Sequence, residues 1–394
     1  MLRLTVFDYL LSFTSFRYWK PATVLLCSFI CLFFNNPDYR RFQLHTSTNP
    51  EFSDYYYNWQ ALYNQITHPL TPQHHSPTSH QSKRAFRLLP VLIGRAMPFE
   101  QMEAKLMALF AFQHLLGFLS FYLLLEIILS ATGDKVYAWL STLGFSFIYF
   151  GNAFFWDLYG WFDGVAYCML LLTCYLIGRS QLAWAFLSLS AAFWTDERAI
   201  MGSPVVLGWF LLGQKDLKVL GPTLAQLRPA LLWYGLCLTT YVLLRTYLGH
   251  AYQLSVPMGF NALVGLKMIL INMQAMPNSL FSIFEGLWLP FVLLMGWLWT
   301  KQHKKSFVII LLCFSLSVLT SLCVIDVTRS LTYTFLWIVF GIVWLYRLGE
   351  TDFCRTLMLT TLGLSFIFPN LFYLGKAVVV VANYSQLVKL LGFS

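Results

Sequence analysis

The sequence predicts an all-α protein, a polytopic transmembrane helix bundle of about 11 spans with a range of about 9 to 12. Composition carries the prediction. Of the 394 residues, 58% are hydrophobic and only 11% are charged, whereas an ordinary soluble domain has about 25% charged residues. A soluble globule could not cover this much apolar surface with so few charges. The composition therefore excludes a soluble enzyme, a disordered chain and a small disulfide scaffold.

Apolar stretches recur along the whole chain, which we interpret as one integral membrane domain over residues 1–394. Several stretches are shorter than about 18 residues and contain Gly, Trp or Pro, so some are candidates for re-entrant segments. The stretches fall at about 21–34, 104–129, 136–155, 162–178, 182–195, 199–213, 230–248, 279–299, 306–325, 331–346 and 356–375.

Two segments differ from this pattern. Residues 1–20 mix apolar side chains with Arg3, Arg17 and Lys20, which is typical of an amphipathic helix at a membrane interface. Residues 35–103 form the one long connection between predicted spans. We expect residues 1–20 to be a cytoplasmic interfacial helix. We expect residues 35–103 to be a first extracytoplasmic loop with amphipathic surface helices.

The distribution of basic residues sets this orientation. With the N-terminus in the cytoplasm, most lysines and arginines of the short loops fall on the cytoplasmic side, as the positive-inside rule requires. We therefore attribute the net charge of +9 to these loops and not to nucleic-acid binding. The eight cysteines include no C-x-x-C pair, so neither a zinc site nor a disulfide framework is expected.

The same orientation places many acids at or near the outer face, several of them beside aromatic residues. A sugar ring stacks its apolar face on an aromatic ring while its hydroxyls donate to carboxylates, so these residues are candidates for substrate binding. They are Trp156, Asp157, Trp161, Asp163, Asp196, Glu197 and Asp326. The alternative is an interfacial aromatic belt with acids that are solvated helix ends.

Four arginines are candidates for holding a phosphate, because a guanidinium binds two phosphate oxygens at once. Arg84 and Arg87 lie in a basic stretch, 83–90, that is typical of a surface helix; there the alternative is a general contact with anionic lipid. Arg198 and Arg329 closely follow acids, so each could instead neutralise its neighbours.

Other motifs are uninformative or missing. Five histidines lie between His45 and His80, but no metal-ligand spacing such as H-E-x-x-H supports a metal site. We interpret their Pro- and Ser-containing segment as an access loop or linker. The sequence contains no P-loop, no G-x-G-x-x-G and no G-x-S-x-G. Nucleotide hydrolysis and serine hydrolase chemistry are therefore unsupported.

The long first extracytoplasmic loop contains an acid followed by aromatics, Asp54-Tyr55-Tyr56-Tyr57, and then Arg87-Leu88-Leu89-Pro90. With this loop and its many spans, the chain resembles the GT-C superfamily of membrane glycosyltransferases. Members have their catalytic acid in this loop, followed closely by aromatics. Some bacterial members have a similar Arg-x-x-Pro segment before the second span. Many members have two adjacent acids there, whereas Asp54 stands alone, so Asp38 is kept as an alternative.

The resemblance implies transfer of a sugar from a polyprenyl-phosphate-linked donor to an extracytoplasmic glycan, lipid or protein. It favours a bacterial inner membrane protein whose partners are the lipid-linked sugar and membrane lipids, without nucleic acid and without an evident protein partner. The acceptor hydroxyl needs a carboxylate base, and the leaving phosphate needs Arg, Lys or a divalent metal ion. Asp54 is the predicted base, and the four arginines are the predicted phosphate ligands.

Two other functions stay open at this stage. A transporter or flippase of lipid-linked sugars would use Asp196, Glu197, Glu285 and Asp326 as an ion path. These acids, however, are expected at one end of their spans, whereas a path must cross the bilayer. An O-antigen polymerase or ligase would also act on lipid-linked sugars. Such proteins tend to carry their large loop late in the chain, whereas here it follows the first span.

Overall fold

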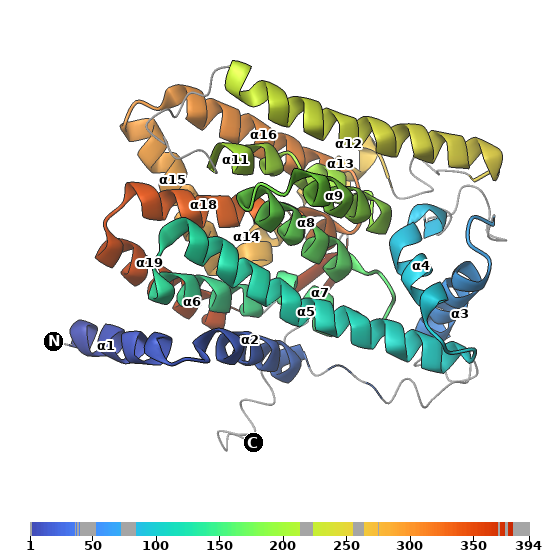
Figure 1. Cartoon of the computed structure of the whole chain (residues 1–394), viewed down its shortest axis with the longest axis horizontal. Helices are drawn as coiled ribbons and strands as arrows, with labels where there is room; N and C mark the ends of the chain where they lie inside the picture. The colour runs from blue at the N-terminus through green and yellow to red at the C-terminus, as the bar shows by residue number, and fades with distance from the viewer. Residues whose placement is uncertain are drawn as a thin grey trace.

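The computed structural model describes residues 2–35, 37, 39, 53–71, 84–212, 224–254, 264–274, 276–368, 371–374 and 377–380. These residues form helices and one antiparallel hairpin (Figure 1), and the predicted all-α class is confirmed. The first part of the chain forms α1 (Leu2–Ser15), α2 (Trp19–Asn35), α3 (Ser53–Thr67), α4 (Leu88–Ala96), α5 (Met102–Thr132), α6 (Lys135–Gly144), η3 (Phe145–Phe147), α7 (Tyr149–Phe155), α8 (Asp163–Gly178), α9 (Leu182–Thr195), α10 (Ala199–Gly202) and α11 (Val205–Leu212). The second part forms α12 (Leu224–Ala251), α13 (Leu266–Met273), α14 (Met276–Phe284), η5 (Glu285–Leu287), α15 (Trp288–Thr300), α16 (Lys304–Leu322), α17 (Val327–Thr332), α18 (Phe335–Leu348), α19 (Thr351–Ile367), β1 (Leu371–Leu374) and β2 (Ala377–Val380).

Some helical segments are long and apolar enough to cross a membrane. Among the described residues they are Met102–Thr132, Met276–Thr300, Lys304–Leu322 and Val327–Leu348. A fifth candidate is the pair Phe7–Ser15 and Trp19–Asn35, which bends by 114° at its break. Shorter apolar helices cover Asp163–Gly178, Leu182–Thr195 and Ala199–Phe210. By length and hydropathy, the described helices fit an integral membrane protein with four or five candidate spans.

Most of the longer helices lie side by side and run along the long axis of the molecule (Figure 1). The longest, α5, has 31 residues, which corresponds to about 46 Å at 1.5 Å per residue. Helices α3 and α4 lie together at the end of the molecule where α5 begins (Figure 1). The side chains of α3 that face the protein include Trp59, Leu62 and Ile66, whereas Gln60 and Asn64 are exposed, so α3 is amphipathic.

The centre of the bundle contains α18, whose residues from Phe335 to Leu345 are all buried. A helix that is apolar all round is stable only inside a bundle or a membrane. Beside it, Tyr167 of α8 stacks on Phe150 of α7, with ring centroids 5.8 Å apart. The cysteines are free, and Cys313 and Cys323 are the two that are only partly buried.

The last predicted span, 356–375, is shorter than expected. Helix α19 ends at Ile367, because Pro369 follows and a residue before proline is disfavoured in helical conformation. The next described residues form the β1–β2 hairpin, in which Leu371 pairs with Val380. The β-branched Val378–Val380 favour a strand, a signal that the sequence interpretation did not use.

Candidate functional site

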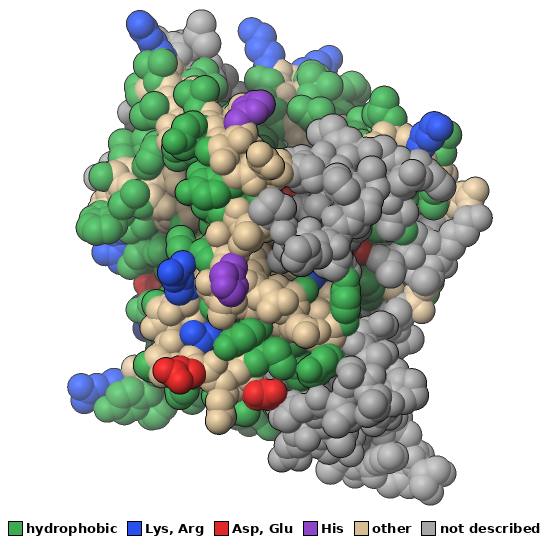
Figure 2. All heavy atoms as spheres, turned by 90° about the vertical axis from the view of Figure 1, so that its right-hand side faces the viewer, with side chains coloured by type: hydrophobic (Ala, Val, Ile, Leu, Met, Phe, Trp, Pro, Cys, Tyr) green, Lys and Arg blue, Asp and Glu red, His purple; other side chains and the backbone are tan. Residues whose placement is uncertain are grey.

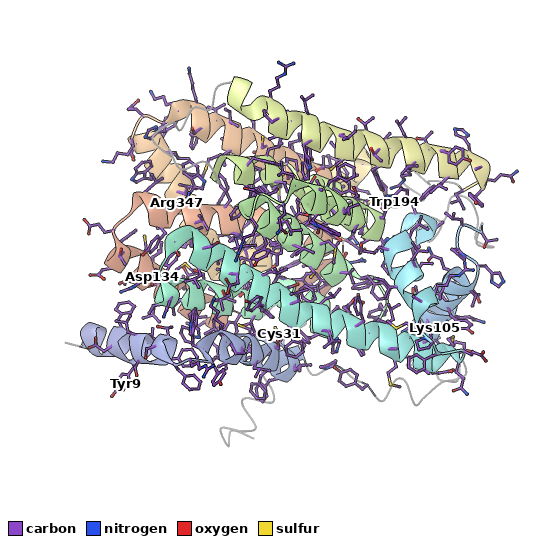
Figure 3. The ribbon with its side chains drawn as sticks, viewed as in Figure 1. Tyr9, Cys31, Lys105, Asp134, Trp194 and Arg347 are labelled. Atoms are coloured by element: carbon purple, nitrogen blue, oxygen red, sulfur yellow. The ribbon has the colours of Figure 1, made fainter. Side chains whose placement is uncertain are left out.

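Among the described residues, six charged side chains that the sequence predicts on the outer face come together in a network of ion pairs. Trp194, two residues before Asp196 in the sequence, lies toward the opposite end of the molecule from Asp134 (Figure 3). The six side chains come from four separate segments: the residue before α4, the start of α8, the α9–α10 link and the start of α17. We call them the charge cluster, and its members are Arg87, Asp163, Asp196, Arg198, Asp326 and Arg329. Three arginines face three carboxylates, so the ionised cluster is neutral.

Asp163 is the centre of the cluster. Its Oδ1 accepts hydrogen bonds from Arg198 Nη2 at 2.8 Å and from the Tyr333 hydroxyl at 3.0 Å. Its Oδ2 accepts from Arg329 Nε at 2.5 Å. The position at the first turn of α8 adds the favourable field of the helix N-terminus for a negative charge. Asp163 therefore joins α8 to the two arginine-bearing segments.

Arg198 and Asp196 form a bidentate ion pair. Arg198 Nε donates to Asp196 Oδ1 at 2.8 Å and Nη2 donates to Oδ2 at 2.7 Å, while Arg87 Nη2 lies 2.8 Å from the same Oδ2. Burial alone would raise the pKa of Asp196, but Arg198 and then Arg87 hold it well below its usual range. Burial alone would lower the pKa of Arg198, but Asp163 and Asp196 raise it well above its ordinary value. Both side chains are thus ionised at neutral pH.

The guanidinium group of Arg329 makes several contacts within the protein. Besides its contact with Asp163, its Nη1 donates to Asp326 Oδ2 at 2.9 Å, and its Nη2 lies 3.3 Å from Asp163 Oδ1. The guanidinium also lies over the Trp161 ring, 4.1 Å from the centroid, where a cation is attracted to the ring face. All three guanidinium nitrogens of Arg329 are therefore used within the protein.

The cluster is buried. Asp196 has no exposed area, and the exposed fractions of Asp163, Arg329 and Arg198 are 1%, 3% and 4%. On the described surface at this end of the molecule only scattered charged side chains are visible (Figure 2). Removing one partner of a buried ion pair leaves the other charge uncompensated inside the protein, which is strongly destabilising.

Asp157 lies beside the cluster and organises the turn between α7 and α8. Its carboxylate accepts main-chain N–H bonds from Tyr159 at 3.0 Å, Trp161 at 3.0 Å and Phe162 at 2.9 Å. The turn needs this support because Gly160 and Phe162 both have positive φ, at 78° and 60°. Burial, followed by the nearby carboxylate of Asp163, raises the pKa of Asp157 to about 6, although these N–H bonds act in the opposite direction.

The same turn presents an aromatic stack. Trp161 stacks on Tyr159 with centroids 4.9 Å apart and on Phe372 of β1 at 5.7 Å, both nearly parallel. Trp156 lies at the edge of this stack, 5.9 Å from Phe372. The hairpin is fixed in place by the Tyr373 N–H, which donates to the Thr328 hydroxyl of α17 at 2.8 Å. The predicted sugar platform, Trp161, is therefore covered by the hairpin.

Helix α3 is attached directly to the site. The indole N–H of Trp59 donates to the Leu158 carbonyl at 2.7 Å, and Arg84 Nη1 donates to Asn58 Oδ1 at 2.7 Å. Asp54 belongs to the first turn of α3, but its side chain is outside the described residues. The alternative base, Asp38, also falls outside them, as do all but one of the five clustered histidines, the exception being His68.

A cavity of about 10 Å³ lies between α3, α4 and the Asp157 turn, enough for about one water. Its polar lining is Gln65, Arg84 and Arg87. Arg87 Nε is buried without a hydrogen-bond partner among the residues that the structure describes, which leaves one donor for a ligand. Burial, followed by the charges of Arg87 and Arg329, lowers the pKa of Arg84 to about 10, which leaves Arg84 cationic at neutral pH.

Glu197 and Glu285 do not join the cluster. Glu197 Oε2 lies 3.9 Å from Arg245 Nη1 of α12, and the Arg245 guanidinium covers Phe86 at 4.6 Å. Glu285 is buried, neither of its carboxylate oxygens has a hydrogen-bond partner among the described residues, and its φ is 47° within η5. Among the described residues, no group of three or more His, Cys, Asp or Glu is placed to hold a metal ion.

Several site residues were missed by sequence reasoning. Tyr333 follows Arg329 by four positions, a spacing that puts two helical residues on one face and could have indicated its bond to Asp163. Arg245 is a cation within a predicted span, which by itself marks a candidate functional residue. Asn58 and Gln65 gave no signal, because polar residues on an amphipathic helix are ordinarily solvated.

Comparison of the chain with protein-family models, with curated proteins and with solved structures finds no match.

Proposed function

We propose that the chain is a membrane glycosyltransferase of the GT-C type that moves a sugar from a polyprenyl-phosphate-linked donor to an extracytoplasmic acceptor. The observation that carries the proposal is the place of Arg84 and Arg87. Both line one cavity together with Ala61, Leu62 and Gln65 of α3, about two to three turns after Asp54 in the same helix. A base and a phosphate site on neighbouring elements are the two parts that the reaction needs.

The proposed topology has about 11 spans. It is supported by the order of the helices, because every predicted apolar stretch overlaps a helix or a broken helix in the structure. Breaks at η5, between α6 and α7, and between α10 and α11 divide some of these stretches into shorter helices. The proposed orientation places Asp134 and Arg347, at one end in Figure 3, in the cytoplasm, and Trp194 at the other end outside.

In the proposed mechanism Asp54 accepts the proton of the acceptor hydroxyl as that hydroxyl attacks the anomeric carbon. The phosphate that leaves gains negative charge, and Arg84 and Arg87 stabilise it. Arg198 and Arg329 are assigned a different role, since each guanidinium is bonded to two carboxylates of the cluster, whereas Arg87 contacts one carboxylate among the described residues. They hold α8, the α9–α10 link and α17 in the positions that shape the site.

Substrate entry requires the site to open in this proposal. A cavity that holds about one water cannot take a sugar ring. Phe372 occupies part of the Trp161 surface on which a sugar would stack. We assign the opening to the hairpin, which is held by the Tyr373–Thr328 hydrogen bond and by aromatic contacts.

The transporter alternative has less support. Its proposed ion path would connect Asp196, Asp326 and Glu285 through the bilayer. Asp196 and Asp326 are instead bonded to Arg198 and Arg329 in one cluster, and within the described part of the chain Glu285 has no hydrogen-bond partner that could accept a proton from it.

The test uses purified protein in lipid nanodiscs with a panel of polyprenyl-phosphate-linked hexoses, and mass spectrometry measures the release of polyprenyl phosphate. We expect Asp54→Asn to remain folded and to lose about 10²- to 10⁴-fold in rate. Arg87→Gln should lower activity as well, whereas Arg95→Gln, an exposed arginine of α4 that does not line the cavity, should not. Full activity of Asp54→Asn would move the base to Asp38 or Asp157. Release of polyprenyl phosphate by none of the donors would count against a glycosyltransferase.

A further inference from the structure

A second, larger cavity lies at the end of the bundle away from the charge cluster. Its volume is about 450 Å³, and it opens between α1, the α5–α6 turn, α18 and α19. Asp134, one of its lining residues, and Arg347 of the neighbouring helix end lie at one end of the molecule in Figure 3, whereas Trp194 and Lys105 lie at the other. This cavity is therefore separate from the proposed catalytic site.

The carboxylate of Asp134 accepts three hydrogen bonds from residues that the structure describes. Asp134 Oδ1 accepts the Tyr137 N–H at 3.0 Å and so caps α6. Its Oδ2 accepts from the Tyr346 hydroxyl at 3.0 Å and from Arg355 Nε at 2.7 Å. Asp134 is only 5% exposed, so its role is to fix the cavity wall.

Two cations in the cavity keep donors available. Lys135 is exposed and makes no ion pair with any described residue. Arg355 uses Nε on Asp134, and its Nη1 and Nη2 have no acceptor in the described part of the chain. Lys135 is also the first residue of α6, where the helix N-terminus favours an anion. Glu350 and Asp352 precede Arg355 in sequence but do not line the cavity.

The wall opposite these cations belongs to α1 and is partly apolar. Of its side chains, Leu11, Thr14 and Ser15 line the cavity, and Leu11 is 43% exposed. An inorganic anion gains nothing from contact with an apolar surface. A phosphate that carries hydrocarbon chains can cover it, because the chains can pack on the exposed Leu11 side chain.

We propose that this cavity binds the phosphate of an anionic membrane phospholipid, held by Lys135 and Arg355, with its chains against the exposed side chains of α1. Basic pockets between membrane helices bind anionic headgroups in this way. The bound lipid would join α1 to α6 and α19, since the three elements supply the walls of the cavity. This site is independent of the glycosyltransferase proposal.

The test measures binding of phosphatidylglycerol to the full chain in detergent by native mass spectrometry, with phosphatidylcholine as the neutral lipid. We expect Lys135→Gln to weaken phosphatidylglycerol binding about fivefold, the effect of about one cation near the surface. Lys301→Gln, an exposed lysine that does not line the cavity, is the matched control and should bind as the wild type does. Because Arg355 also supports Asp134, Lys135 is the better position for the test.

Two results would overturn the proposal. One is equal binding of phosphatidylglycerol by the wild type and by Lys135→Gln. The other is equal stabilisation by a phosphate without hydrocarbon chains. We expect phosphatidylglycerol to raise the melting temperature of the protein and millimolar inorganic phosphate to leave it unchanged. Equal stabilisation by both would assign the cavity to free phosphate and not to a lipid.

Discussion

Asp163 and Arg329 lie 166 positions apart in the chain and form an ion pair of 2.5 Å between Oδ2 and Nε. Asp163 begins α8, and Arg329 lies within α17, so this one contact joins the two halves of the chain. Because Arg198 and the Tyr333 hydroxyl also bond to Asp163, this carboxylate links Arg198 to Arg329 within the cluster.

The charge of Asp163 should therefore be essential for folding. Asp163→Asn leaves Arg198 and Arg329 buried with one carboxylate fewer, and we expect a loss of roughly 3–5 kcal/mol in stability. Thermal unfolding of the purified protein in detergent measures this loss. Glu197→Gln is the control, since Glu197 is 3.9 Å from its partner and its side chain is 26% exposed. Equal melting temperatures for the two variants would show that the cluster does not hold the bundle together.

Arg329→Lys should lower the amount of folded protein. A single ammonium group cannot replace the three guanidinium contacts to Asp163 and Asp326, and a loss of roughly 2–5 kcal/mol follows. Arg87→Lys should behave differently, because Arg87 has one carboxylate contact and an unpaired Nε. For Arg87→Lys we expect a larger loss in donor use than in folded yield. Size-exclusion yield and donor turnover, measured together, separate the two variants.

Stability should depend on pH through Asp157. Its pKa is raised to about 6 in the folded protein and is about 3.9 in the unfolded chain, so the folded state binds more protons between these values. Stability should then fall as the pH rises from about 4 to 6, by an amount on the order of 1–3 kcal/mol. Asp196, whose pKa is lowered, contributes a change of opposite sign that lies below about pH 4. The difference in stability between the wild type and Asp157→Asn, followed by melting temperature, should therefore change by this amount between pH 4 and pH 6, and a difference that is constant with pH would contradict the prediction.

The hairpin should loosen when Phe372 is truncated. The ring is 3% exposed and contacts Trp161 and Trp156, so Phe372→Ala removes most of the packing that holds β1. We expect faster hydrogen exchange at the Tyr373 amide, which now donates to Thr328. Val378→Ala, at a residue of β2 that is 51% exposed, should leave that exchange rate unchanged. An unaltered rate in Phe372→Ala would mean that other contacts secure the hairpin.

The proposed orientation can be tested with single introduced cysteines. We expect Gln60→Cys, on the exposed side of α3, to be modified by an impermeant reagent from the extracytoplasmic side. Gln181→Cys, in the exposed turn between α8 and α9, should be modified from the cytoplasmic side only. The wild-type protein, with mostly buried cysteines, gives the background signal. Labelling of Gln60→Cys from the cytoplasm would reverse the assignment of faces.

The sequence was informative about helices and about which charges gather, because both follow from local pattern. Apolar runs predict helices directly, and acids at span ends such as Asp163 and Asp326 are placed on one face by chain direction alone. Which carboxylate pairs with which arginine was not predictable from local pattern. Whether Arg198 neutralises only Asp196 or also reaches Asp163 depends on how α8 and α9 pack, which no local pattern contains. The hairpin was missed because its strands follow a helix within one apolar run, and Phe372 became part of the site only through the fold.

The order in which the charge cluster is completed has a consequence for biosynthesis. Arg87, Asp163, Asp196 and Arg198 are made first and form a balanced set of two arginines and two carboxylates. Asp326 and Arg329 then arrive together with α17 as a paired acid and base. The cluster therefore contains equal numbers of arginines and carboxylates at either stage. A substitution at Asp163 exposes the growing protein to cellular quality control from α8 onward, whereas one at Arg329 does so only after most of the bundle has been inserted.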